Sequence, residues 1–236
     1  MIDYDKWFRE IAGEPKVNSN HAPFFPSSIR CVIAGRSGSG KTNLMFKFIM
    51  NREIDCDDAY IYSKSINQSI YKNFRKLYNA LKSEFKDRVT TFHFFDSDKD
   101  TDIINPSEQD PNKKHLMIFD DIVDKKQVEI VQKYFRLGRH NNANCFYLHQ
   151  SFHEVDKHGI RDNANMFILF EHCRKTLRHI HDDYISTDME LNEFESFCKE
   201  AWSQKHGFIV INLWEDPKCG RYVSNYKVIY TPKKYI

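Results

Sequence analysis

Eight residues near the start of the chain have the types and spacing needed to hold a polyphosphate. The pattern G-x-x-x-x-G-K-[ST] is met by Gly35, Arg36, Ser37, Gly38, Ser39, Gly40, Lys41 and Thr42. Glycines let the backbone curl so that its N–H groups point inward, and a following helix adds the positive end of its dipole. Lys41 would reach the β- and γ-phosphates, and Thr42 would supply a hydroxyl to Mg²⁺. The motif predicts a nucleoside triphosphate, ATP with Mg²⁺, as the ligand.

The surroundings of this loop favour that interpretation over a Gly/Ser-rich turn that happens to carry a lysine. The apolar run Ile29–Ala34 precedes the loop as a strand, and Asn43–Met50 follows it with helical character. A phosphate loop needs this strand–loop–helix context.

Two neighbouring acids and a glutamine follow later apolar strands. His115–Val123 contains the pair Asp120 and Asp121, and the strand Asn144–His149 is closed by Gln150. Asp120 is the expected carboxylate opposite Thr42 for Mg²⁺. Asp121 is the candidate general base for an attacking water, with a turn-capping role as its alternative. Gln150 is placed to sense the γ-phosphate and that water.

Arg139 lies in a loop between a helix and the Gln150 strand. An arginine there would sit at the rim of the sheet and point into a neighbouring subunit's nucleotide. Such a residue stabilises transition-state charge in phosphoryl transfer. A solvated surface arginine is the alternative.

Strands alternate with helices through residue 170, which predicts an α/β fold with a mostly parallel sheet and helices on both faces. We divide the chain into an N-terminal segment 1–28, an ATPase core 29–172 and a C-terminal extension 173–236 of helices and a β-hairpin. In the extension, Phe208–Trp214 and Tyr226–Tyr230 are expected to pair as antiparallel strands. A helix is expected over Gln68–Phe85, with its apolar face formed by Ile70, Phe74, Leu77, Leu81 and Phe85.

Composition restricts the partners and the compartment. The formal net charge is only +2, so bulk charge does not argue for nucleic acid. The six cysteines form no Cys-x-x-Cys pair, which indicates a reducing compartment. No apolar run is long enough to span a bilayer, and Met1–Glu10 does not resemble a signal peptide. We expect a soluble intracellular protein without a membrane partner.

The combined motifs resemble a specific family. The phosphate loop, Ile118–Asp121, the run 138–142, the run 147–151 and Arg161-Asp162-Asn163 with Met166–Phe170 are similar to the poxvirus-type DNA-packaging ATPases. That family occurs in nucleocytoplasmic large DNA viruses, virophages and related elements, within the FtsK–HerA superfamily. Two departures are the Asp-Asp pair, where Asp-Glu is commoner in the superfamily, and His149, where a small or hydroxyl residue is more usual.

This resemblance implies a RecA/FtsK-like P-loop NTPase that hydrolyses ATP and translocates double-stranded DNA into a viral capsid. It implies a ring, usually a hexamer, with ATP between subunits and Arg139 acting in trans. A capsid or portal protein is a further candidate partner, and host cytoplasm, viral factory or virion are the expected locations. The alternatives are a cellular or plasmid FtsK/HerA-type DNA pump and a nucleotide kinase.

Overall fold

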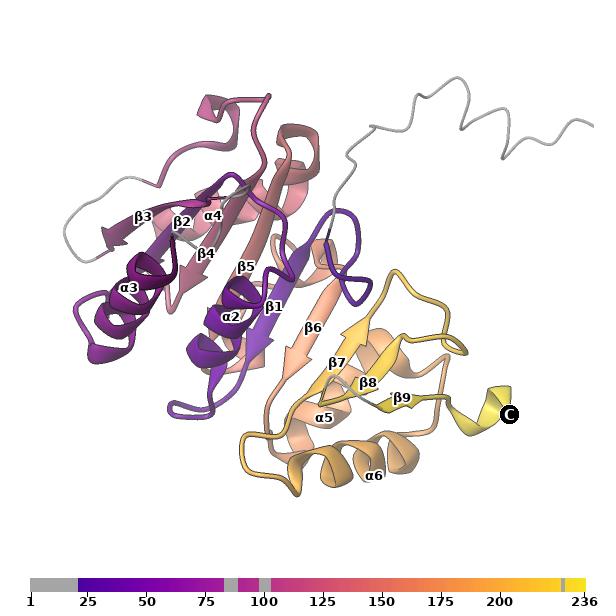
Figure 1. Cartoon of the computed structure of the whole chain (residues 1–236). Coiled ribbons are helices and arrows are strands. Elements are labelled where there is room, and N and C mark those ends of the chain that lie inside the picture. The colour runs from indigo at the N-terminus through magenta and orange to yellow at the C-terminus, as the bar shows by residue number, and fades with distance from the viewer. Residues whose placement is uncertain (1–20, 83–88, 98–102, 226–227) are drawn as a thin grey trace, which may run out of the picture.

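A computed structural model describes residues 21–82, 89–97, 103–225 and 228–236 (Figure 1). Within these residues no helix is long and apolar enough to cross a membrane. The helices are α2 (Lys41–Met50), α3 (Ser69–Leu81), α4 (Lys125–Leu137), α5 (Arg174–Ile180) and α6 (Leu191–Trp202). The strands are β1 (Arg30–Ala34), β2 (Asp58–Ser63), β3 (Thr91–Asp96), β4 (His115–Asp120), β5 (Ala143–His149), β6 (Met166–Leu169), β7 (Ile209–Asn212), β8 (Tyr222–Ser224) and β9 (Val228–Tyr230).

The described strands form one sheet in the order β3-β2-β4-β5-β1-β6-β7-β8-β9. Neighbours from β3 to β6 pair in parallel, and β7, β8 and β9 continue the sheet in antiparallel fashion. The strand β1 is central, with β5 on one side and β6 on the other. The strand β5 separates β1 from β4. Segments that follow β1, β4 and β5 therefore meet at one edge of the sheet, where ligands bind in folds of this kind.

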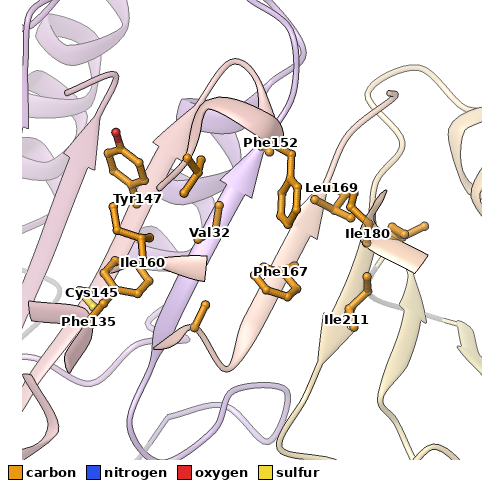
Figure 2. Close-up of a cluster of buried hydrophobic side chains, with 14 of the residues drawn as sticks. Val32, Phe135, Cys145, Tyr147, Phe152, Ile160, Phe167, Leu169, Ile180 and Ile211 are labelled. Carbon is orange, nitrogen blue, oxygen red and sulfur yellow. The ribbon is translucent and has the colours of Figure 1, made fainter. Parts of the chain in front are cut away.

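Helices cover both faces of the sheet, which explains why β1 is apolar after its first residue, Arg30 (Figure 1). Val32 and Ala34 pack into the core that includes residues of α4, α5 and α6, whereas Cys31 and Ile33 pack into the core that includes residues of α2 and α3. All four side chains are fully buried. Figure 2 shows part of the first core, in which the rings of Phe152 and Phe167 meet edge to face with centroids 5.3 Å apart. The predicted α/β fold with a mostly parallel sheet is confirmed.

Two local predictions are wrong. The expected pairing of 208–214 with 226–230 does not occur, because β8 lies between β7 and β9. Three residues are too few for β8 to show a periodic pattern in the sequence. The helix expected over 68–85 is α3, and residues 83–88 lie outside the described part of the chain. The predicted apolar face of this helix is wrong at Leu77, which is 51% exposed, whereas the buried residues are Tyr71, Phe74 and Tyr78.

Candidate functional site

The phosphate loop joins β1 to α2 and requires glycine at defined positions. Gly38 and Gly40 adopt φ of 75° and 109°, the left-handed region that favours glycine. At Gly35 an added Cβ would lie 2.6 Å from Cβ of Phe170, because the loop passes close to the end of β6. The Ser39 N–H closes the turn by donating to the Arg36 carbonyl at 3.1 Å. The loop thus curls at the start of α2, where the first helical N–H groups have no acceptor within the helix.

Lys41 is almost completely buried beneath this loop. Its ammonium donates to the carbonyls of Gly35 at 2.5 Å and Arg36 at 3.1 Å. Burial lowers the pKa of Lys41, and the nearby charges of Asp120 and Asp121 oppose that change. The buried Oγ of Ser39 has no hydrogen-bond partner among the described residues. A buried cation and an unpaired hydroxyl in a curled loop fit a polyphosphate ligand.

Asp120 ends β4 and is linked to two other elements through a single oxygen. Its Oδ2 accepts a hydrogen bond from Oγ1 of Thr42 at 3.0 Å and another from the phenol of Tyr71 on α3. Burial raises the pKa of Asp120, while the hydrogen bonds from Tyr71 and Thr42 and the charge of Lys41 act in the opposite direction. A hydroxyl and a carboxylate side by side are the hard oxygen donors that Mg²⁺ prefers. These residues fit the predicted metal site.

Asp121 and Gln150 are in direct contact at the same edge. Nε2 of Gln150 donates to Oδ2 of Asp121 at 2.8 Å. The backbone of Asp121 has φ of 60°, a left-handed value that is uncommon for residues other than glycine, and its N–H donates to the Leu148 carbonyl of β5 at 2.9 Å. Backbone strain of this kind is concentrated at functional sites. The acid and the amide are therefore held together beside Asp120.

Together these side chains line one pocket of about 290 Å³. Its walls come from the phosphate loop, from the ends of β2, β4 and β5, and from the start of α3: Ser37, Gly38, Gly40, Lys41, Thr42, Asn43, Ser63, Ser65, Gln68, Ser69, Ile70, Tyr71, Asp120, Asp121 and Gln150. The sequence predictions missed the contribution of α3. Tyr71 would have been found if tyrosine had been counted among the core positions of that helix.

Arg139 does not lie in this pocket. It sits in the 3₁₀ turn Gly138–Asn141 before β5, exposed, with Nε 3.4 Å from Nε2 of His140. The seven residues of β5 separate it from Gln150, which is roughly 20 Å at the usual rise per strand residue. Arg139 is therefore at the opposite edge of the sheet from the phosphate loop, beyond the reach of its own pocket.

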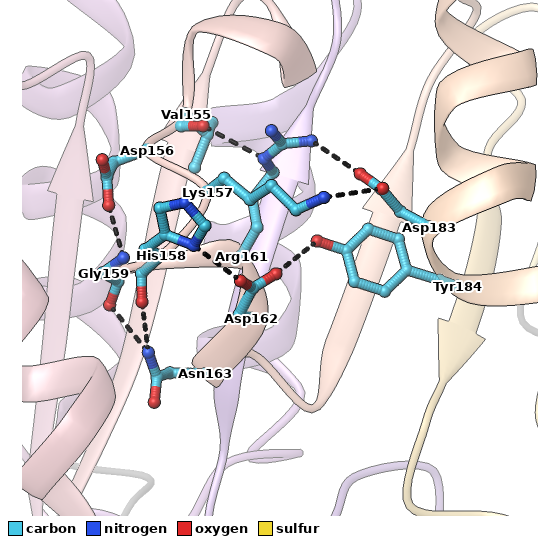
Figure 3. A network of polar contacts seen from close by, with 10 residues as sticks. All are labelled: Val155, Asp156, Lys157, His158, Gly159, Arg161, Asp162, Asn163, Asp183 and Tyr184. Atoms are coloured by element: carbon cyan, nitrogen blue, oxygen red, sulfur yellow. Dashed lines mark hydrogen bonds and ion pairs between the residues drawn. The ribbon is translucent and has the colours of Figure 1, made fainter.

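The residues Arg161, Asp162 and Asn163 also lie outside the pocket, before β6 (Figure 3). Arg161 donates to the Val155 carbonyl at 3.1 Å and pairs with Asp183 at 3.7 Å. Asp162 accepts a hydrogen bond from the phenol of Tyr184 at 3.3 Å. These contacts join the segment before β6 to the π-helical turn His181–Ile185 that follows α5. In this structure the residues Arg161 and Asp162 therefore stabilise the packing of that segment.

A phosphate loop after a central parallel strand, with paired acids and an amide at the same edge, defines a P-loop NTPase. The sequence pattern of the family described as Poxvirus A32 protein matches residues 19–211, which is most of the chain. The chain belongs to this family of viral genome-packaging ATPases. The predicted family and the predicted ATPase class are confirmed. No curated protein matches the sequence.

Solved structures with the same fold include the genome packaging NTPase B204 from Sulfolobus turreted icosahedral virus 2. The B204 complex with AMP has a TM-score of 0.54 and 13% identity, over 84% of this chain and 96% of B204. The complex with AMPPCP has a TM-score of 0.50 and 13% identity, over 79% of this chain and 93% of B204. At this identity the similarity establishes the fold.

Proposed function

We propose that this chain hydrolyses ATP with Mg²⁺ to drive double-stranded DNA into a viral capsid, as one subunit of a ring, with a hexamer as the expected size. Membership of the A32 family supports the packaging role. The position of Arg139 is the observation that supports a ring of subunits. Its side chain and the phosphate loop lie at opposite edges of one sheet. A complete site would form where the Arg139 edge of one subunit meets the pocket edge of the next.

The pocket residues have separate roles in this proposal. Lys41 and the loop N–H groups hold the phosphates, and Thr42 and Asp120 present oxygens to the metal. Mg²⁺, when bound, neutralises charge on the β- and γ-phosphate oxygens. Asp121 accepts a proton from the water that attacks the γ-phosphorus. The side-chain amide of Gln150, whose Nε2 lies 2.8 Å from Oδ2 of Asp121, orients the Asp121 carboxylate.

Arg139 stabilises the charge that develops on the γ-phosphate of the neighbouring subunit. Its position supports action in trans because no rotation of its side chain brings it into its own pocket. Removal of an arginine with this role lowers turnover by roughly a thousandfold or more. Nucleotide affinity should change little, because the contact is made mainly in the transition state.

The test mixes Arg139→Ala subunits with Lys41→Ala subunits and measures phosphate release with linear duplex DNA. Each variant alone should be nearly inactive. In mixed rings, some interfaces join an intact pocket from the first variant to an intact arginine from the second. Hydrolysis should return in proportion to the number of such interfaces. Arg136→Ala is the matched control, because Arg136 is an exposed arginine in the last turn of α4, and it should retain wild-type turnover.

The outcomes separate the alternatives. An arginine that acts in its own subunit gives a defect that mixing cannot rescue, and a solvated arginine gives no defect. Absence of rescue in mixed rings verified by native mass spectrometry would remove the trans role. Phosphate transfer to a nucleoside, with no response to DNA, would replace the pump by a kinase.

A further inference from the structure

A histidine from the C-terminal part of the chain lies directly on the phosphate loop. Nδ1 of His206 is 2.9 Å from the carbonyl oxygen of Ser39, a contact between residues 167 positions apart. Because a carbonyl can only accept, Nδ1 carries the proton and donates. The ring also lies beside Gly40, where an added Cβ would be 3.5 Å from Nδ1 of His206 and 3.6 Å from the ring of Phe170. The imidazole is thus fixed at the loop by one nitrogen, while the residue as a whole remains exposed.

The loop between α6 and β7 that carries this histidine is rigidly built. His206 has φ of 60°, and at the next residue, Gly207, an added Cβ would overlap the carbonyl oxygen of Ala201. Asn225, which directly follows β8, holds the loop in place, because its side-chain amide donates to the Ala201 carbonyl at 3.1 Å and accepts from the Phe208 N–H at 2.9 Å. A strained conformation that is held so firmly, and that presents an exposed aromatic ring, is typical of a functional position.

The order of strands limits the directions in which a nucleotide can lie. Asp121 and Gln150 follow β4 and β5, on one side of β1, and mark the end of the site where the γ-phosphate reacts. His206 precedes β7, beyond β6 on the other side of β1. A nucleotide whose γ-phosphate faces the acids has two directions for its base: over the start of α3, which lines the pocket, or across the loop toward His206, which lies outside the pocket lining.

We propose that His206 contacts the nucleobase and forms the base end of the nucleotide site. This inference rests on the nucleotide site proposed above. The ring provides an aromatic face at the loop, and stacking on such a face is available to any base. The C-terminal segment thereby becomes part of the site, although the sequence motifs of the site all lie before residue 151.

The experiment compares two ligands that differ in the base. AMPPCP carries a nucleoside and is not hydrolysed, whereas inorganic tripolyphosphate has the same phosphate chain without one. Both are titrated calorimetrically with Mg²⁺ into the full chain. His206→Ala should weaken AMPPCP binding by about three- to tenfold, the usual scale for an aromatic contact, and leave tripolyphosphate binding unchanged. His206→Phe keeps the ring and should bind AMPPCP within about twofold of wild type.

A matched variant tests the opposite side of the loop. Ile70 lines the pocket at the start of α3, so Ile70→Ala probes the opposite placement of the base, and it should change the ratio of the two affinities less than His206→Ala does. If Ile70→Ala weakens AMPPCP alone and His206→Ala does not, the base lies over α3 and the proposal is wrong. Equal loss of both ligands in His206→Ala also overturns it, because His206 would then only support the loop. A wild-type chain that binds neither ligand refutes the nucleotide site itself.

Discussion

Replacing Tyr71 by phenylalanine tests whether α3 helps to hold the metal site. The phenol of Tyr71 donates to Oδ2 of Asp120, the same oxygen that accepts from Thr42. Both Tyr71 and Asp120 are buried, so water cannot easily replace the lost donor. Tyr71→Phe removes one oxygen and leaves the packing of the ring intact. The carboxylate should become less well oriented and harder to ionise.

The size of the effect follows from the kind of hydrogen bond that is lost. A hydrogen bond to a charged group contributes about 1.5–3 kcal/mol, which corresponds to roughly 10- to 150-fold in an equilibrium constant. Partners that orient a metal ligand typically change metal affinity by about 10- to 100-fold. We therefore expect the Mg²⁺ concentration for half-maximal ATP hydrolysis to rise by about 10- to 100-fold in Tyr71→Phe.

The assay is phosphate release at fixed ATP across a Mg²⁺ titration. Turnover at saturating Mg²⁺ should approach that of wild type, because the proposed base Asp121 and the proposed trans-acting Arg139 are unaffected. Tyr78→Phe is the control: Tyr78 lies two turns further along the buried face of α3, and its phenol donates to the Thr90 carbonyl at 2.9 Å, away from the acids. That variant should lose some stability and keep its Mg²⁺ dependence. An unchanged Mg²⁺ midpoint in Tyr71→Phe would refute the reasoning.

Three further predictions concern neighbouring groups. Asp121→Asn should keep nucleotide affinity and lose turnover by roughly a hundredfold or more, as judged by single-turnover hydrolysis; lost binding with an unchanged rate per bound ATP would make Asp121 a structural or metal residue. Gly35→Ala places a Cβ 2.6 Å from Phe170 and should reduce the free energy of unfolding by about 1–3 kcal/mol in urea titrations; unchanged stability would mean that β6 can move away. Because burial raises the pKa of Asp120 and metal binding needs its ionised form, Mg²⁺ affinity should fall as pH drops through that raised pKa. Tyr71→Phe should move this fall to higher pH, because the lost hydrogen bond favoured ionisation; a fall at the same pH would show that the phenol does not affect the charge.

Much of the pocket could be predicted from sequence, because its parts are short motifs attached to buried strands. The glycines at 38 and 40 serve a loop that needs left-handed backbone. Asp120 ends one strand and Gln150 follows another, all residues of both strands are buried, and strands of that kind are visible as largely apolar runs. Parallel strands bring their carboxyl ends to one edge, so the meeting of these residues follows from the alternation of strands and helices.

Other features depend on packing between elements, which a local sequence pattern does not predict. The sequence does not show which face of α3 turns inward. Leucine at 77 was expected inside and is half exposed, whereas Tyr71 and Tyr78 are buried with their hydroxyls bonded. A tyrosine can occupy a core position only when its hydroxyl finds a partner, and those partners lie on other elements. The contact of His206 with the phosphate loop likewise depends on how β7 joins the sheet.

The central position of β1 also has a consequence for how the chain is made. The first residue of β1, Arg30, aligns with Cys145 of β5, 115 residues later, and its N–H donates to Asn165, 135 residues later. At translation rates of about 5–20 residues per second, the 115 residues between Arg30 and Cys145 take roughly 6–23 s to synthesise, and β1 has no neighbouring strand before then. During that time the apolar strand residues 31–34 have no partner strand on either side, a condition that favours aggregation of nascent chains. Production of this protein should therefore depend strongly on chaperones and on slow, cool expression.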